Sequence, residues 1–334
     1  MARAPRVTRA ARYGGGVGMV GVALLGALLG VLLAEAKLAR RWVGTPDDTV
    51  PDANGTWGHG SGEPIRLAVL GDSGAAGFGV AHAVETPAAL IATGVSAAAR
   101  RPVTLASVAA VGATAADLGP QLDQVLAHRP QVAVILIGAN DVKRRVPPAV
   151  SVQHLAAAVL RLREAGAEIV VGTCPDLGTV RPLAQPLRAL ARRWSRRMAA
   201  AQTIAVVEAG GRAVSLGEIL GPEFAARPAE LFGADRFHPS AEGYAAAAAV
   251  LLPSVCAAIG LVPEDELPGP PGRRRRIRPV ARAAAQAASH AGTEVTGARL
   301  GGRDRGPWGR WARLRRRRPS PVAEPAADDF QPAG

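Results

Sequence analysis

The chain has 334 residues, enough for one large domain or two small ones with a sizeable buried core. Only 4% of the residues are aromatic, and short β-branched runs recur at intervals, which favours a layered α/β domain over an all-β sandwich. The formal charge of +13 is concentrated at the two ends: residues 263–334 carry 15 arginines against eight acidic residues, whereas residues 63–262 are close to neutral. Because the central part is nearly uncharged overall, no specific nucleic-acid partner is expected.

The pattern of the N-terminal region indicates a membrane anchor. Residues 1–13 form a basic segment, and residues 14–34 form an uncharged run long enough to span a bilayer. This pattern predicts a transmembrane helix that is retained, with a cleaved, secreted form as the alternative because Ala34-Glu35-Ala36 offers a cleavage site. Basic residues flank the run on both sides, so the positive-inside rule gives only a slight preference for an extracytoplasmic catalytic domain. Residues 35–62, rich in Pro, Gly, Asp and Asn, are expected to be a linker.

Periodic structure is predicted to begin at residue 63. Short, nearly continuous apolar runs of the kind found in sheets covered on both faces alternate with amphipathic helical patterns. The predicted strands are Ile65–Leu70, Val103–Ala109, Val132–Ile137, Ile169–Thr173 and Ile204–Val207, and a last helix is predicted from Ser240 towards Ile259. The alternation predicts a doubly wound, five-stranded parallel sheet over residues 63–262.

The C-terminal residues 263–334 consist largely of Pro, Gly, Ala and Arg with little apolar periodicity. This composition predicts a disordered tail whose arginines are able to contact anionic lipid. Cys174 and Cys256 allow at most one disulfide and form no metal-binding motif. Such a sparse, widely separated pair favours free thiols.

The first predicted strand ends in Gly71-Asp72-Ser73-Gly74. A serine at the carboxyl end of a buried parallel strand lies where open α/β sheets place their ligand crevices, so Ser73 is a candidate nucleophile. A serine hydroxyl needs a neighbouring base, and His238 is the best candidate among six histidines because Asp235 precedes it by three residues in a predicted loop. An acid at that spacing can orient the imidazole and stabilise its protonated form.

Two further strand ends offer donors for a developing oxyanion. Gly112, after the second strand, allows a close approach of its backbone N–H, and Asn140, after the third strand, carries a side-chain amide. Taken singly, each is also consistent with an ordinary turn or helix cap. Together with Ser73 and His238, they are expected to converge on one crevice.

These blocks, in this order, resemble the SGNH, or GDSL, family of serine hydrolases over residues 63–262. The resemblance implies a three-layer α/β/α, flavodoxin-like fold and a serine esterase or lipase that needs no metal or cofactor. It implies Ser73 as nucleophile, His238 as base and then acid, and Asp235 as the acid that orients His238. The oxyanion hole would consist of the N–H groups of Ser73 and Gly112 and the side chain of Asn140. The sequence departs from the motif at Gly74, where leucine is usual, which bears on local packing more than on catalysis.

The substrate implied is a small-molecule, lipid or carbohydrate ester, with the acyl group and the alcohol left open. A conventional α/β-hydrolase would carry Gly-x-Ser-x-Gly, but Ala75 occupies the last position. The sequence contains no GxxxxGK[ST] motif, so it gives no support to a phosphate-binding domain. The alternative of a different class is a catalytically idle, membrane-anchored binding or scaffold protein with a basic tail.

Overall fold

The structure is a computed structural model that describes residues 50–261, seven positions between residues 26 and 37, and three short backbone segments at 278–279, 293–297 and 311–316. Most of the predicted transmembrane helix at 14–34 and most of the tail lie outside the described residues, so both stay predictions. Among the described residues, one helix, Ala241–Ala258, is long and apolar enough to cross a membrane. This helix packs on the sheet within the domain, as the core helix of a water-soluble domain would.

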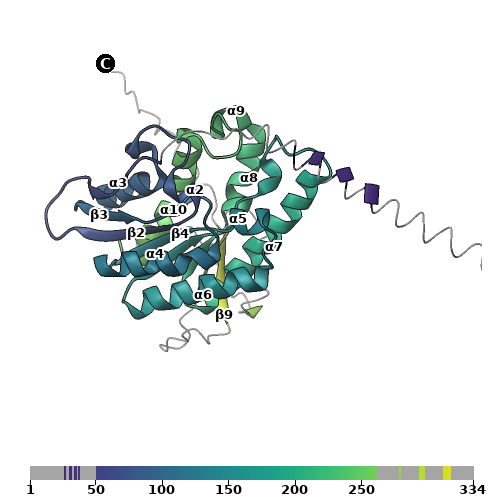
Figure 1. Cartoon of the computed structure of the whole chain (residues 1–334). Coiled ribbons are helices and arrows are strands. Elements are labelled where there is room, and N and C mark those ends of the chain that lie inside the picture. Colours follow the sequence, from purple (N-terminus) through teal and green to yellow (C-terminus); the bar gives the residue numbers. More distant parts are fainter. Residues whose placement is uncertain are drawn as a thin grey trace, which may run out of the picture.

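Strands and helices alternate along the chain (Figure 1). The strands are β1 (Gly55–Trp57), β2 (Ile65–Gly71), β3 (Val103–Ser107), β4 (Val132–Leu136), β5 (Glu168–Gly172), β6 (Arg212–Val214), β7 (Arg278–Pro279), β8 (Thr293–Gly297) and β9 (Trp311–Arg316). The α-helices are α2 (Ser73–Ala76), α3 (Pro87–Ala99), α4 (Leu118–Val125), α5 (Ala139–Lys143), α6 (Pro148–Glu164), α7 (Leu187–Glu208), α8 (Leu216–Ala226), α9 (Pro228–Leu231) and α10 (Ala241–Ala258). Short 3₁₀ turns are η1 (Ala83–Glu85), η2 (Ala115–Asp117), η3 (Leu126–His128) and η4 (Leu177–Thr179).

The described strands form one sheet in the order β1-β3-β2-β4-β5-β6-β8-β9-β7. The five strands from β3 to β6 are parallel, whereas β1, β8, β9 and β7 are antiparallel to their neighbours. The parallel centre that the sequence predicts is therefore confirmed, but the whole sheet is mixed. Because the chain order reverses between β3 and β4 on either side of β2, the carboxyl end of β2 is the point where an open sheet forms a crevice.

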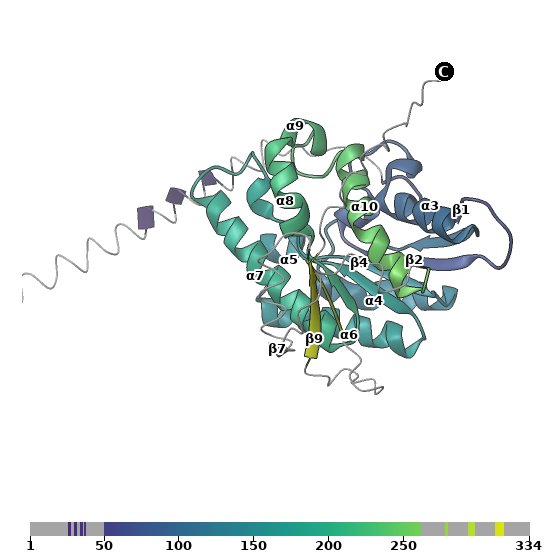
Figure 2. The same ribbon diagram turned by 180° about the vertical axis from the view of Figure 1, so that it is seen from behind.

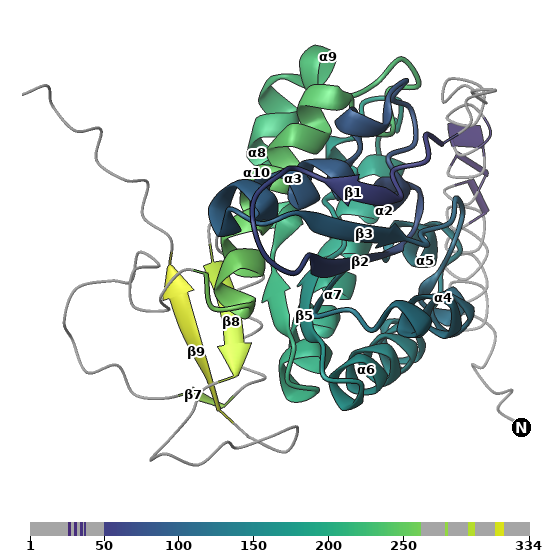
Figure 3. The same ribbon diagram turned by 90° about the vertical axis from the view of Figure 1, so that its left-hand side faces the viewer.

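Helices cover both faces of the sheet. The helices α3, α8 and α10 lie on one face, and α4, α6 and α7 lie on the other, as the edge-on and reverse views show (Figures 2 and 3). Alternate residues of each central strand feed the two cores: Leu67 and Val69 of β2 face one, and Ala68 and Leu70 face the other. All five residues of β4 are buried, as a strand covered on both faces requires.

The prediction of a fifth strand at Ile204–Val207 is wrong. Residues 204–207 form the last turn of α7, and the strand that follows is β6, after Gly210 and Gly211. The helix buries Val206 and Val207 against the sheet, so a run of apolar residues there suits a helix as well as a strand. Periodicity over four residues does not distinguish the two, and the glycine pair marks the true boundary.

The predicted linker and tail also contain structure. Residues 55–57 form β1 instead of a linker, because Trp57 packs on the core and its indole N–H donates to Ala53 O at 2.7 Å. The backbone of β8 pairs with β6, and β9 pairs with β8 and β7, so the tail is not disordered throughout. Cys174 and Cys256 are free, buried thiols, as predicted.

A close approach of two strand ends fixes the edge of the sheet. Gly71, the last residue of β2, has a φ of +139°, and a Cβ atom there would lie 1.9 Å from the carbonyl oxygen of Leu136. The next residue, Asp72, donates its N–H to that same oxygen at 3.0 Å. Only glycine satisfies both conditions, because any side chain would collide with backbone that cannot move without breaking the sheet.

We therefore expect Gly71→Ala to lower the free energy of unfolding by on the order of 3–5 kcal/mol. Gly119→Ala is the matched control: Gly119 lies in α4 with nothing within 4 Å of its would-be Cβ, so alanine should stabilise the protein by about 0.5–1 kcal/mol through helix propensity. Urea unfolding followed by circular dichroism measures both. Equal stabilities of the two variants would contradict the role assigned to Gly71.

Candidate active site

Ser73 begins the short helix α2 directly after β2. Asp72 caps this helix, and its Oδ1 accepts the N–H of Gly74 at 2.9 Å. Gln121 of α4 also holds this turn: its side chain accepts the N–H of Gly71 at 2.8 Å and donates to the Gly71 carbonyl at 2.9 Å. These hydrogen bonds fix the backbone on both sides of Ser73 and therefore the direction in which its side chain points.

His238 lies in the loop between α9 and α10, and Asp235 shapes that loop from within. The Oδ1 atom of Asp235 accepts the backbone N–H groups of Phe237 and His238, each at 2.9 Å. The Gly233 N–H donates to the His238 carbonyl at 2.8 Å, which closes the loop. Asp235 therefore holds the backbone of His238 as well as its ring.

The three side chains form a continuous chain of contacts. The Oδ2 atom of Asp235 lies 2.5 Å from His238 Nδ1, and His238 Nε2 lies 3.0 Å from Ser73 Oγ. With Nδ1–H donating to the carboxylate, Nε2 is left as the acceptor that faces the serine. The rings of Phe78 and Phe237, centred 4.5 and 5.0 Å from the imidazole, limit its movement. The sequence predicted all three members of this constellation.

The two predicted oxyanion donors lie on adjoining loops. Asn140 is buried on α5, and its Nδ2 donates one hydrogen bond to Ala113 O at 3.0 Å, which leaves its second amide hydrogen for a ligand. Among the described residues, the N–H groups of Ser73 and Gly112 have no backbone or side-chain acceptor. The structure thus joins the Asn140 loop directly to the Gly112 loop.

Other residues that sequence reasoning missed hold these loops in register. Asp141 is buried and accepts the N–H of Ala115 at 3.1 Å, and Arg144 donates to the Gly112 carbonyl at 2.8 Å. Gln202 of α7 accepts from Cys174 N–H at 2.7 Å and donates to Ile137 O at 2.9 Å. No local motif marks Gln202, because its partners come from strand ends far away in the sequence and the buried face of α7 also carries the polar residues Ser195 and Thr203.

The remaining described histidines take no part in this site. The backbone N–H of His82 donates to Glu85 at the start of η1, and His128 ends η3. His59 lies before β2, and His154 lies on α6, on the far side of the sheet from α10. These positions agree with the sequence-based choice of His238.

Two carboxyl groups of the site have shifted pKa values in opposite directions. Burial raises the pKa of Asp72 from 3.8 to about 6, although the Gly74 N–H and the nearby His238 act against the shift. Burial also acts on Asp235, but hydrogen bonds from the His238 ring and from the N–H groups of Phe237 and His238 outweigh it and lower its pKa. Asp235 is therefore the carboxylate that stays ionised beside His238.

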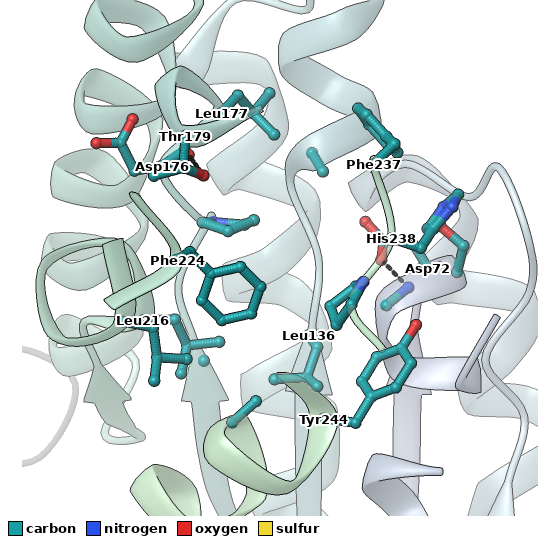
Figure 4. Close-up of a pocket in the computed structure, with 18 of the residues that line it drawn as sticks. Asp72, Leu136, Asp176, Leu177, Thr179, Leu216, Phe224, Phe237, His238 and Tyr244 are labelled. Carbon is teal, nitrogen blue, oxygen red and sulfur yellow. Dashed lines mark hydrogen bonds between the residues drawn. The ribbon is translucent and has the colours of Figure 1, made fainter. Parts of the chain in front are cut away.

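A cavity of about 140 Å³ opens beside Ser73 (Figure 4). Ser73 and His238 line one side, and the rest of its wall is mostly apolar. Figure 4 shows Phe224 and Leu216 across the space from His238, Leu136 and Tyr244. Ser73 thus faces an apolar cavity and not only open solvent.

The fold and this arrangement of side chains are typical of a hydrolase, and comparison with known proteins identifies the family. The model of the GDSL-like lipase/acylhydrolase family matches residues 69–246, which include Ser73, Gly112, Asn140, Asp235 and His238. The chain belongs to this family and is a hydrolase that acts on ester bonds. The GDSL-like esterase Rv1075c of Mycobacterium tuberculosis is 41% identical over 282 residues, which cover 80% of this chain and 90% of that protein.

Two solved structures are similar to part of the chain. TesA is 22% identical with a TM-score of 0.45 and matches 59% of this chain and 99% of its own. A catalytic mutant of Axe2, an acetylxylan esterase from Geobacillus stearothermophilus, is 21% identical with a TM-score of 0.46 and matches 60% of this chain and 95% of its own.

The raised pKa of Asp72 predicts a pH effect on stability. Between pH 4 and 6 the folded protein holds a proton on Asp72 that the unfolded chain has lost, so this residue's contribution to stability falls as the pH rises through that range. Asp72→Asn removes the titration while keeping an acceptor for the Gly74 N–H. The variant should therefore gain stability relative to the wild type from pH 4 to 7, by up to about 3 kcal/mol.

Urea unfolding at several pH values measures this difference, and Asp123→Asn is the control. Asp123 is exposed and pairs with Arg161 on the surface, so its replacement should leave the pH dependence close to that of the wild type. A constant difference between Asp72→Asn and the wild type across this range would show that Asp72 does not titrate there.

Proposed function

We propose that the protein hydrolyses carboxylic esters through a Ser73-His238-Asp235 triad and a covalent acyl-enzyme. The observation that carries the proposal is the unbroken series of contacts from Asp235 Oδ2 to His238 Nδ1 at 2.5 Å and from His238 Nε2 to Ser73 Oγ at 3.0 Å. Membership of an esterase family supports the same reaction class.

In the first half-reaction, His238 Nε2 takes the proton from Ser73 Oγ as the oxygen attacks the ester carbonyl. The carbonyl oxygen becomes negative in the tetrahedral intermediate and accepts hydrogen bonds from the Asn140 amide and the N–H groups of Ser73 and Gly112. Asp235 stabilises the imidazolium that forms. When the intermediate collapses, the bond to the alcohol oxygen breaks and His238 returns its proton to that oxygen, so the alcohol leaves.

In the second half-reaction, water replaces the alcohol. His238 takes a proton from the water as its oxygen attacks the acyl-enzyme carbonyl, and the same donors stabilise the second intermediate. Collapse breaks the bond to Ser73 Oγ, the oxygen regains a proton from His238, and the carboxylic acid is released. The residues return to their starting state, and the net reaction consumes the ester and one water molecule.

The wider setting of this activity is also proposed. The uncharged run at 14–34 would anchor the domain to a membrane, and the linker would hold the catalytic domain on the extracytoplasmic side. Arginines in the tail would add contact with anionic lipid. The substrate would then be a small-molecule, lipid or carbohydrate ester that reaches the domain at that surface.

A fluorophosphonate probe tests the nucleophile. Wild-type protein should be labelled at Ser73, whereas Ser73→Ala should show no labelling and should lose roughly 10⁴-fold or more in kcat/KM for a p-nitrophenyl ester. Ser151→Ala is the control, because the side-chain hydroxyl of this buried serine of α6 has no hydrogen-bond partner in the described structure. It should be labelled like the wild type. Folded wild-type protein that resists the probe and cleaves no ester would instead favour the idle scaffold.

A substitution at Asn140 tests the oxyanion hole. Asn140→Ala removes one donor from the intermediate and should lower kcat by about 10²–10³-fold. KM should change much less, because the missing hydrogen bond forms mainly in the transition state. Steady-state kinetics with one p-nitrophenyl ester measures both constants. A loss confined to KM would assign Asn140 to substrate binding instead.

A further inference from the structure

The cavity beside Ser73 extends away from the predicted oxyanion donors. Gly112 and Asn140 do not line it; its lining comes from the ends of β4 and β5 and from α8 and α10. It therefore occupies the core layer on the α8 and α10 side of the sheet. When the carbonyl oxygen of an ester points at the predicted oxyanion donors, either its acyl chain or its alcohol can enter this cavity.

Apolar side chains form most of the cavity wall. Leu136 ends β4, Leu216, Leu220 and Phe224 lie on α8, and Val180 and Phe232 are also part of the apolar wall. Each of these side chains is nine-tenths or more buried. Leu216 and Phe224 face Leu136 across the space in Figure 4.

The polar groups around the cavity are already engaged. Asp176 accepts the Gly178 N–H at 2.8 Å and pairs with Arg192 at 3.2 Å, and the Tyr244 hydroxyl donates to Phe78 O at 2.8 Å. Thr179 Oγ1 donates to the Asp176 carbonyl. Thr173, which also lines the cavity, is the exception, because its buried hydroxyl has no hydrogen-bond partner in the described structure. A sugar or another hydroxyl-rich group would lose most of its hydrogen bonds to water here without replacement.

The size of the cavity suits a chain of several carbons. A single water molecule needs about 10–15 Å³ of such space, so the cavity has roughly ten times that volume. We infer that it binds the acyl chain of the substrate, and that the substrate is an ester of an aliphatic acid of intermediate length. This inference rests on the proposed function, since Ser73 must be the nucleophile for the cavity to take the acyl group.

Gly172, the last residue of β5, controls the width of the cavity. A Cβ atom at Gly172 would lie 2.5 Å from Leu136 Cδ2 and 2.7 Å from Leu216 Cδ1. Both contacts are with the ends of flexible side chains that line the cavity, so they would have to move into it. Gly172→Ala should therefore shorten the acyl chain that fits, and Leu216→Ala should lengthen it.

The test is a series of p-nitrophenyl esters from acetate to dodecanoate, in which only the acyl group changes. For the wild type, kcat/KM should rise roughly fourfold with each added methylene until the cavity is full and then fall. The optimum should move to shorter chains in Gly172→Ala and to longer chains in Leu216→Ala. The control is Leu160→Ala, on α6 behind the sheet and partly exposed, which should leave the optimum in place.

Other outcomes overturn the inference. A wild-type profile that is highest for acetate and falls with each methylene would show that the cavity does not take the acyl chain. Unmoved optima in both cavity variants would show the same, and if Gly172→Ala fails to fold, Leu216→Phe narrows the cavity instead. In these cases Ser73 is still labelled and esters are still cleaved, so the proposed function stands. Absence of labelling and of all ester cleavage overturns both.

Discussion

The contact between Gly71 and the Leu136 carbonyl is the constraint on which the site depends. It brings the carboxyl ends of β2 and β4 so close that no side chain fits between them. Because α2 starts two residues after Gly71 and α5 starts three residues after Leu136, the same contact sets the distance between the serine loop and the asparagine loop. The edge of the sheet where β2 and β4 end therefore sets the geometry that the proposed attack and charge stabilisation require.

Around that contact, amides and carboxylates tie the loops to one another. Gln121 binds both backbone groups of Gly71, Gln202 joins the ends of β4 and β5, and Asp141 reaches the turn after Gly112. Each of these side chains is buried and uses its hydrogen-bonding groups on backbone. Burying these polar groups costs little free energy while each of them is hydrogen-bonded. A buried group that loses its partner destabilises the fold, so the loops are held in one arrangement.

The central strands and the contacts among Ser73, Asp235 and His238 could be predicted because these segments carry strong local signals, whereas Gly112 and Asn140 are each also consistent with an ordinary turn or helix cap. An apolar run that ends in Gly71-Asp72-Ser73 marks a strand end, and an acid three residues before His238 marks an oriented imidazole. The fifth strand was missed because Val206 and Val207 belong to an apolar helix face that reads like a strand over four residues. The residues that support the site, and the cavity behind Ser73, depend on contacts between distant segments, which no short pattern encodes.

The acid and the base lie in one loop, 162 and 165 residues after Ser73, close to the end of the folded domain. If the residues act as proposed, a growing chain carries its nucleophile long before it carries the imidazole, and Ser73 remains an ordinary hydroxyl until α10 has docked on the sheet. Hydrolytic activity then appears only in a chain that has finished folding. If the domain is also exported as proposed, that order would keep the unfinished protein harmless to the esters of the compartment in which it is made.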